Sequence, residues 1–148
     1  MVAGGPNEYL RNQVLTAPPE QLQMMLYDGA IRFARQGREA IERNDIEQSY
    51  NLLTRAQRIV LEMLNGLRRE VNPELCDRMS ALYTFIYRRL VEASVHRDVR
   101  ALDEALGILI YQRDTWALLL EKLAQERGQI AQTASVGHAE PESVNIEG

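Results

Sequence analysis

The chain has 148 residues, the length of one domain and enough to bury roughly 70% of its unfolded surface around a single core. Hydrophobic residues make up 45% of it and charged residues 26%, as in ordinary soluble globular proteins. The 17 cationic and 21 anionic side chains give a formal net charge of −4, which argues against a generic nucleic-acid binder.

Few side chains are suited to catalysis or to metal binding. The single cysteine, Cys76, excludes an intramolecular disulfide and favours a reducing compartment. Neither His96 nor His138 has a glutamate three residues before it, as carboxylate-bridged di-metal bundles require. The N-terminus does not have the pattern of a secretory signal, and no apolar run approaches the roughly 20 residues of a membrane span. We therefore expect a cytoplasmic protein that is not an enzyme, holds no cofactor or metal and does not insert into a membrane.

The first long segment predicts an amphipathic helix that begins after Thr16. Thr16 is a good N-cap, and Pro18 and Pro19 fit the first turn, where backbone N–H groups have no helical partner. We expect the helix to end near Arg43 and Asn44. Its predicted inward residues recur at steps of three and four: Leu22, Leu26, Gly29, Ala30, Phe33, Gly37 and Ile41.

Three more helices are predicted, each after a capping residue: Asp45, Asn72 (followed by Pro73) and Asp98. The inward residues predicted for the second helix are Ile46, Tyr50, Leu53, Gln57, Val60, Leu64 and Leu67. Those for the third are Leu75, Met79, Leu82, Ile86, Leu90 and Ala93. Those for the fourth are Leu102, Leu106, Leu109, Arg113, Trp116, Leu120 and Leu123.

Four helices joined by short connections predict an all-α fold, an antiparallel up-down-up-down four-helix bundle. We expect three parts: an N-terminal segment over residues 1–15, the bundle over 16–127 and a disordered acidic tail over 128–148. Residues 7–14 can form a short helix. The tail has no helical periodicity and carries three glutamates with no lysine or arginine.

Arg113 is unusual because it falls on the inward side of the fourth helix. It is expected either to form a buried pair with a carboxylate such as Asp28 or Asp114, or to stack its guanidinium on an aromatic ring. Both interpretations give it a mainly structural role, as for Trp116 and Tyr83.

Several apolar residues lie away from the predicted core faces. At about 100° per residue, the fourth helix points Ile108, Tyr111, Leu118 and Leu119 away from its core. The other helices place further apolar residues beside or opposite their core faces: Met24, Tyr27, Ile31, Leu52, Ile59, Met63, Tyr87 and Val91. Wide apolar faces are also normal where a helix touches two neighbours. Otherwise, such ridges receive an amphipathic helix from a partner, mediate self-association or are covered by residues 7–14.

Several motifs resemble the FliS family of flagellar secretion chaperones, over about residues 9–123. Tyr9 is followed by the string from Asn12 to Leu22 and by Met-Leu-Tyr-Asp-Gly-Ala over residues 25–30. The later matches are Arg55-Ala56-Gln57-Arg58-Ile59-Val60, Leu82-Tyr83 and Arg113-Asp114-Thr115-Trp116.

The resemblance implies a cytosolic four-helix bundle that binds the disordered C-terminal segment of flagellin. Binding would keep flagellin from polymerising and would help deliver it to the flagellar type III export gate. The expected client contacts are Leu52, Ile59, Met63, Tyr87, Val91, Ile108, Tyr111 and Leu118. Tyr9 and Val14 are expected to form an N-terminal latch or to contact a component of the export gate. The alternative is a self-associating structural or regulatory bundle without a secretion client. A monomer or a weak homodimer fits either function.

Overall fold

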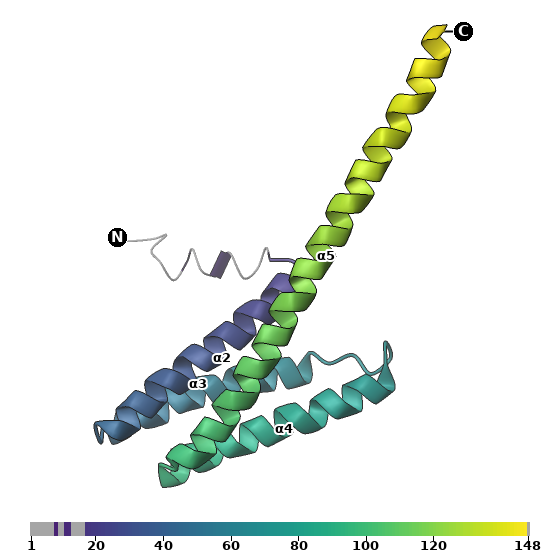
Figure 1. The fold of residues 1–148 in the computed structure, drawn as a ribbon. Coiled ribbons are helices and arrows are strands. Elements are labelled where there is room, and N and C mark those ends of the chain that lie inside the picture. Colours follow the sequence, from purple (N-terminus) through teal and green to yellow (C-terminus); the bar gives the residue numbers. More distant parts are fainter. Residues whose placement is uncertain (1–7, 9–10, 13–16, 148) are drawn as a thin grey trace. The chain divides into compact units, whose positions relative to one another are not determined.

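The computed structural model describes residues 8, 11–12 and 17–147, with side chains up to Ser135. It contains the helices α2 (Pro19–Glu42), α3 (Ile46–Asn65), α4 (Pro73–His96) and α5 (Val99–Glu147), and no strand among the described residues (Figure 1). Two compact units are distinguished, residues up to Asp114 and residues from Thr115 onward. The first unit contains α2, α3, α4 and the beginning of α5, which confirms the predicted helical bundle.

The helices begin where their capping residues predict. The side chains of Asp45, Asn72 and Asp98 each accept a backbone N–H three residues later, at 3.1 Å. These bonds satisfy amide groups that have no partner within the helix. The start of α2 differs from the prediction: Pro18 is the N-cap and Pro19 begins the helix, without a side-chain cap. Thr16 lies outside the described residues.

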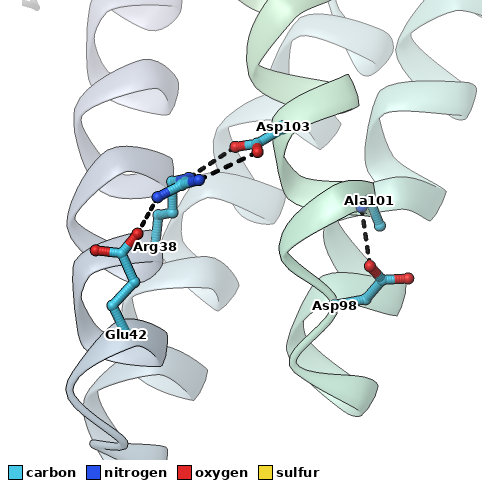
Figure 2. A network of polar contacts seen from close by, with 5 residues as sticks. All are labelled: Arg38, Glu42, Asp98, Ala101 and Asp103. Carbon is cyan, nitrogen blue, oxygen red and sulfur yellow. Dashed lines mark hydrogen bonds and ion pairs between the residues drawn. The ribbon is translucent and has the colours of Figure 1, made fainter.

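Ion pairs show that α5 runs antiparallel to α2. Arg38 pairs with Asp103 through a forked contact, Nε–Oδ1 at 2.7 Å and Nη2–Oδ2 at 3.2 Å (Figure 2). Arg113 Nε donates to Asp28 Oδ1 at 2.9 Å. Moving ten residues back along α2 therefore corresponds to moving ten residues forward along α5. Between α4 and α5, Arg89 Nε lies 3.0 Å from Glu104 Oε2.

Small residues allow α2 and α3 to pack closely. A Cβ atom added to Gly37 would lie 2.6 Å from Leu53 Cδ2, and one added to Gly29 would lie 3.1 Å from Ile59 Cδ1. Ala30, Ala34 and Ala40 of α2 are fully buried, like Ala56 of α3. The close packing means that the core face of α2 is made largely of glycine and alanine.

This use of small residues explains errors in the predicted core faces. Tyr27, Ile31 and Met63 were predicted on outward or flanking faces but are buried, with 2%, 6% and 3% of their surface exposed. Ile46, Tyr50 and Leu75 were predicted inward but are exposed. In α3 the buried residues are Ser49, Leu53, Ala56, Val60 and Met63. A prediction that follows only the large apolar side chains of α3 misses Ser49 and Ala56 and points the helix in the wrong direction.

The interior is completed by a polar contact between α2 and α4. The hydroxyl oxygens of Tyr27 and Tyr83 lie 2.7 Å apart, and Gln23 Nε2 donates to Tyr83 Oη at 3.1 Å. Burial, reinforced by the hydrogen bond with Tyr27, raises the pKa of Tyr83 above its ordinary range. The assignment of Tyr83 to the bundle is confirmed.

The predicted disordered tail is wrong as regards secondary structure, because α5 continues to Glu147. Alanine, glutamine and glutamate, which are good helix formers, are frequent beyond Leu120 and allow the helix to continue. All side chains from Ala124 to Ser135 are exposed, so packing against the core does not stabilise the helix here. Within the described part of the N-terminal segment, Glu8, Arg11 and Asn12 have helical backbone.

Candidate client-binding surface

Apolar side chains are exposed on both sides of α4 in the first unit. Large hydrophobic residues of this surface with more than a third of their area exposed are Ile46, Tyr50, Phe85, Val95 and Tyr111. The described residues contain no cluster of three or more His, Cys, Asp or Glu side chains that could hold a metal ion. No helix in the described part of the chain is long and apolar enough to cross a membrane. The surface is therefore suited to binding an apolar partner.

The side of α4 that faces α3 contains a hollow of about 530 Å³. Ile46 and Tyr50 of α3 line it together with Ser94 and Val95 of α4. Ile46 and Tyr50 lie in the first turns of α3, on the side that faces α4, and are 60% and 61% exposed. They are not covered by α4, because this helix ends at His96 and the chain turns at Arg97, which has a φ of 51°.

Tyr87 and Val91 continue this side of α4. They precede Ser94 by seven and three residues, and therefore share a helical face with it. Both are half-buried. Gln57 Nε2 of α3 donates to the carbonyl of Leu90 at 3.4 Å, which fixes this side of α4 next to α3. The predicted client contacts Tyr87 and Val91 thus lie on the surface that leads to the hollow.

The other side of α4 faces α5. Phe85 lies one turn before Arg89, and Ile108 lies one turn after Glu104. Because Arg89 and Glu104 pair between antiparallel helices, Phe85 and Ile108 stand at the same level on adjoining faces. Tyr111, 69% exposed, is one further turn along α5. Ile108 is half-buried. The predicted outward ridge requires that Ile108 and Tyr111 are not enclosed by the bundle, and neither is.

Other predicted contacts lie elsewhere. Leu52 and Ile59 are half-buried on the α2 side of α3, where Ile59 lies over Gly29 and Leu52 over Gly37. Met63 is in the core, so its predicted placement at the surface is wrong. Leu118 is 68% exposed and belongs to the second unit. Tyr9 and Val14 lie outside the described residues.

Three contributors to the surface were missed from sequence: Phe85, Ile46 and Tyr50. Phe85 was assigned to neither face of α4. It is two positions from Tyr87 and hence on the other side of the helix. Ile46 and Tyr50 were predicted in the core because, with Leu53 and Gln57, they recur at steps of four, three and four residues. Ser49 and Ala56, which follow the same repeat as Leu53 and Val60, were the signal for the true core face.

Arg113 has the structural role that was predicted for it, because it links α5 to α2. Its Nε donates to Asp28, and its Nη1 donates to Asp114 Oδ1 at 3.3 Å. The hydrogen bonds with Asp28 and Asp114 raise the pKa of the guanidinium. The alternative prediction of pairing with a carboxylate is confirmed, although the three side chains are partly exposed rather than buried.

Comparison with known proteins gives consistent matches. The family model described as "Flagellar protein FliS" matches residues 3–123. The chain is 37% identical over 119 residues to the "Flagellar secretion chaperone FliS" of Bacillus subtilis (strain 168), a match that covers 80% of this chain and 88% of the relative. It is 31% identical over 114 residues to the protein of the same name from Salmonella typhimurium, covering 76% and 84%. A solved structure titled "Crystal structure of flagellar chaperone from bacteria" has a similar fold, with a TM-score of 0.66, 23% identity and coverage of 78% and 94%.

Proposed function

Because the chain belongs to the FliS family of flagellar proteins, we propose that it binds the disordered C-terminal segment of flagellin in the cytoplasm and assists its export. The curated relatives are named flagellar secretion chaperones, a non-enzymatic function. The protein then holds its client without converting it. Sequestering the segment prevents premature polymerisation, and delivery to the type III export apparatus follows.

The observation that carries this proposal is the apolar surface on both sides of α4. A disordered segment gains affinity when it folds into amphipathic helices against apolar grooves. Ile46, Tyr50 and Val95 provide one such contact area, and Phe85, Ile108 and Tyr111 provide the other. Two areas separated by the width of a helix suit two short helical pieces of one segment, joined by extended chain.

The N-terminal segment completes the proposal. Tyr9 and Val14 cover the apolar surface in the free protein or contact the export gate once the client is bound. Leu52, Ile59 and Leu118 are kept as candidate client contacts, Leu118 as a residue of the second unit. Leu52 and Ile59 are half-buried against α2, so we expect them to contribute less than Tyr111 or Phe85.

The direct test is binding of full-length flagellin compared with flagellin that lacks its C-terminal segment. We expect binding to the first only, measured by calorimetry with the full chain. Tyr111→Glu should weaken binding roughly tenfold or more, because burial of an aromatic side chain is worth about 1.5–3 kcal/mol and 1.4 kcal/mol is a factor of ten. Val71→Glu is the matched control, since Val71 is 76% exposed in the same unit and belongs to neither contact area.

Equal binding of both flagellins would refute the assignment of the C-terminal segment. Self-association gives a different pattern: sedimentation would show a dimer that Tyr111→Glu dissociates, without any flagellin dependence. This outcome would favour the structural or regulatory bundle.

A further inference from the structure

A second groove lies between α2 and α5, with a volume of about 450 Å³. Ile31 and Ile110 provide its apolar lining. The register set by Asp28 and Arg113 places these two isoleucines at the same level, because each lies three residues from a member of the pair. Ile110 is two residues from Ile108, and two residues correspond to about 200° around a helix. The α2–α5 groove and the candidate client surface therefore use opposite sides of α5.

The arginines around the groove differ in whether they form an ion pair. The guanidinium of Arg113 is already paired with both Asp28 and Asp114. With Arg32 and Arg35 included, the lining has three cations and two anions. Arg32 and Arg35 also line the groove and are exposed. Within the described residues, neither has a carboxylate within ion-pair distance. Arg32 lies 5.1 Å from the ring centroid of the neighbouring Phe33, a contact of modest strength at an exposed position.

We propose that the α2–α5 groove binds a short acidic amphipathic helix of a partner protein, at a site separate from the flagellin surface. Aliphatic side chains of the partner would lie over Ile31 and Ile110. Carboxylates beside them would pair with Arg32 and Arg35, the two lining cations for which the described residues provide no ion-pair partner. Charge complementarity selects an acidic partner, because a basic helix of the same shape would meet both arginines without compensation.

The probe is a synthetic amphipathic peptide of about 18 residues, roughly five helical turns, with leucines on one face and glutamates beside them. Its counterpart carries lysine at every glutamate position. Fluorescence anisotropy with the full-length chain should show binding of the acidic peptide, weakened by added salt because the ion pairs are exposed. Equal binding of both peptides, or of neither, would overturn the proposal.

The double variant R32E/R35E should weaken binding of the acidic peptide roughly tenfold, because it replaces two exposed ion pairs by like-charge contacts. The double variant R58E/R100E is the matched control: it changes the net charge equally at exposed positions of α3 and α5 that do not line the groove. Circular dichroism is the check that both variants fold. Equal weakening in both variants would show a general charge effect and would overturn the site.

The two proposed sites can be separated with the same proteins. R32E/R35E should retain binding of the flagellin C-terminal segment, and Tyr111→Glu should retain binding of the acidic peptide. Failure of flagellin binding in the unmodified protein would refute the proposed function alone. Loss of flagellin binding specifically in R32E/R35E would show that the groove serves the same client, and would overturn a separate site.

Discussion

The hydroxyl oxygens of Tyr27 on α2 and Tyr83 on α4 lie 2.7 Å apart, and both side chains are 98% buried. These residues are 56 positions apart in the sequence. Only one hydroxyl of the pair can donate to the other at a time, and Gln23 supplies a further hydrogen bond to Tyr83. The contact joins two helices that are not consecutive in the chain, and so helps to define how the bundle closes.

Tyr83→Phe should lower the free energy of unfolding by about 1–3 kcal/mol, because it leaves the buried hydroxyl of Tyr27 without its partner. Tyr27→Phe/Tyr83→Phe together should cost less than the sum of the single changes, since neither hydroxyl then remains unpaired. Urea denaturation measures all three. Strict additivity would show that the hydrogen bond contributes nothing.

The same pair predicts a loss of stability in alkali. The folded state keeps Tyr83 neutral because its pKa is raised, whereas in the unfolded chain it ionises near its ordinary value of about 10. Its contribution is therefore complete below pH 10 and decreases as the pH rises further. Unfolding midpoints between pH 8 and about 11.5 should fall less steeply for Tyr83→Phe than for the unmodified protein. Parallel pH profiles would contradict this assignment.

Two glycine substitutions should have opposite effects. Gly37→Ala should destabilise the protein by about 1–3 kcal/mol, since its Cβ would meet both Cγ and Cδ2 of the fully buried Leu53. Gly107→Ala has open space around its Cβ and should stabilise the helix by about 0.5–1 kcal/mol. Thermal unfolding of the two variants gives the sign of each effect. Stabilisation by both changes would mean that α2 and α3 are less closely packed.

Met63 distinguishes a core residue from a client contact. Met63→Ala should lower stability by about 2–5 kcal/mol, because it opens a cavity at a position that is 3% exposed. At temperatures where the variant is fully folded, its affinity for the flagellin segment should be unchanged. A loss of affinity without a loss of stability would return Met63 to the client surface.

Asp103 should show a lowered pKa by NMR titration, because Arg38 donates a forked pair of hydrogen bonds to its carboxylate (Figure 2). A lowered folded pKa gives stability that is present above the unfolded value of about 3.9 and is lost as the pH falls through the folded value. Arg38→Gln should return the carboxyl pKa toward its ordinary value. The effect on stability should be small, because both side chains are exposed.

Removal of residues 128–148 should leave the unfolding midpoint almost unchanged. The described side chains between Ala124 and Ser135 are all exposed, so this part of α5 buries no surface in the core. Helical content measured by circular dichroism should fall with the removed segment. A marked decrease in the midpoint would show that the segment packs against the bundle.

The sequence by itself determined the four helices, because their signals are local. Asp45, Asn72 and Asp98 accept hydrogen bonds from residues three positions away, and apolar side chains repeat with the period of a helix. The family could also be recognised, since the string from Thr16 to Ala30 is contiguous. The pairing of Arg113 with Asp28 was anticipated as one of two possibilities.

Only the tertiary structure decided which face of each helix became the core. A helical wheel gives the relative directions of Tyr50, Leu53 and Met63, but the position of the neighbouring helices decides which of them is covered. Gly29 and Gly37 allow α2 and α3 to approach closely, and Met63 is buried in the resulting core. Tyr50 stays exposed beside Val95, because α4 ends at His96 and does not extend far enough to cover it.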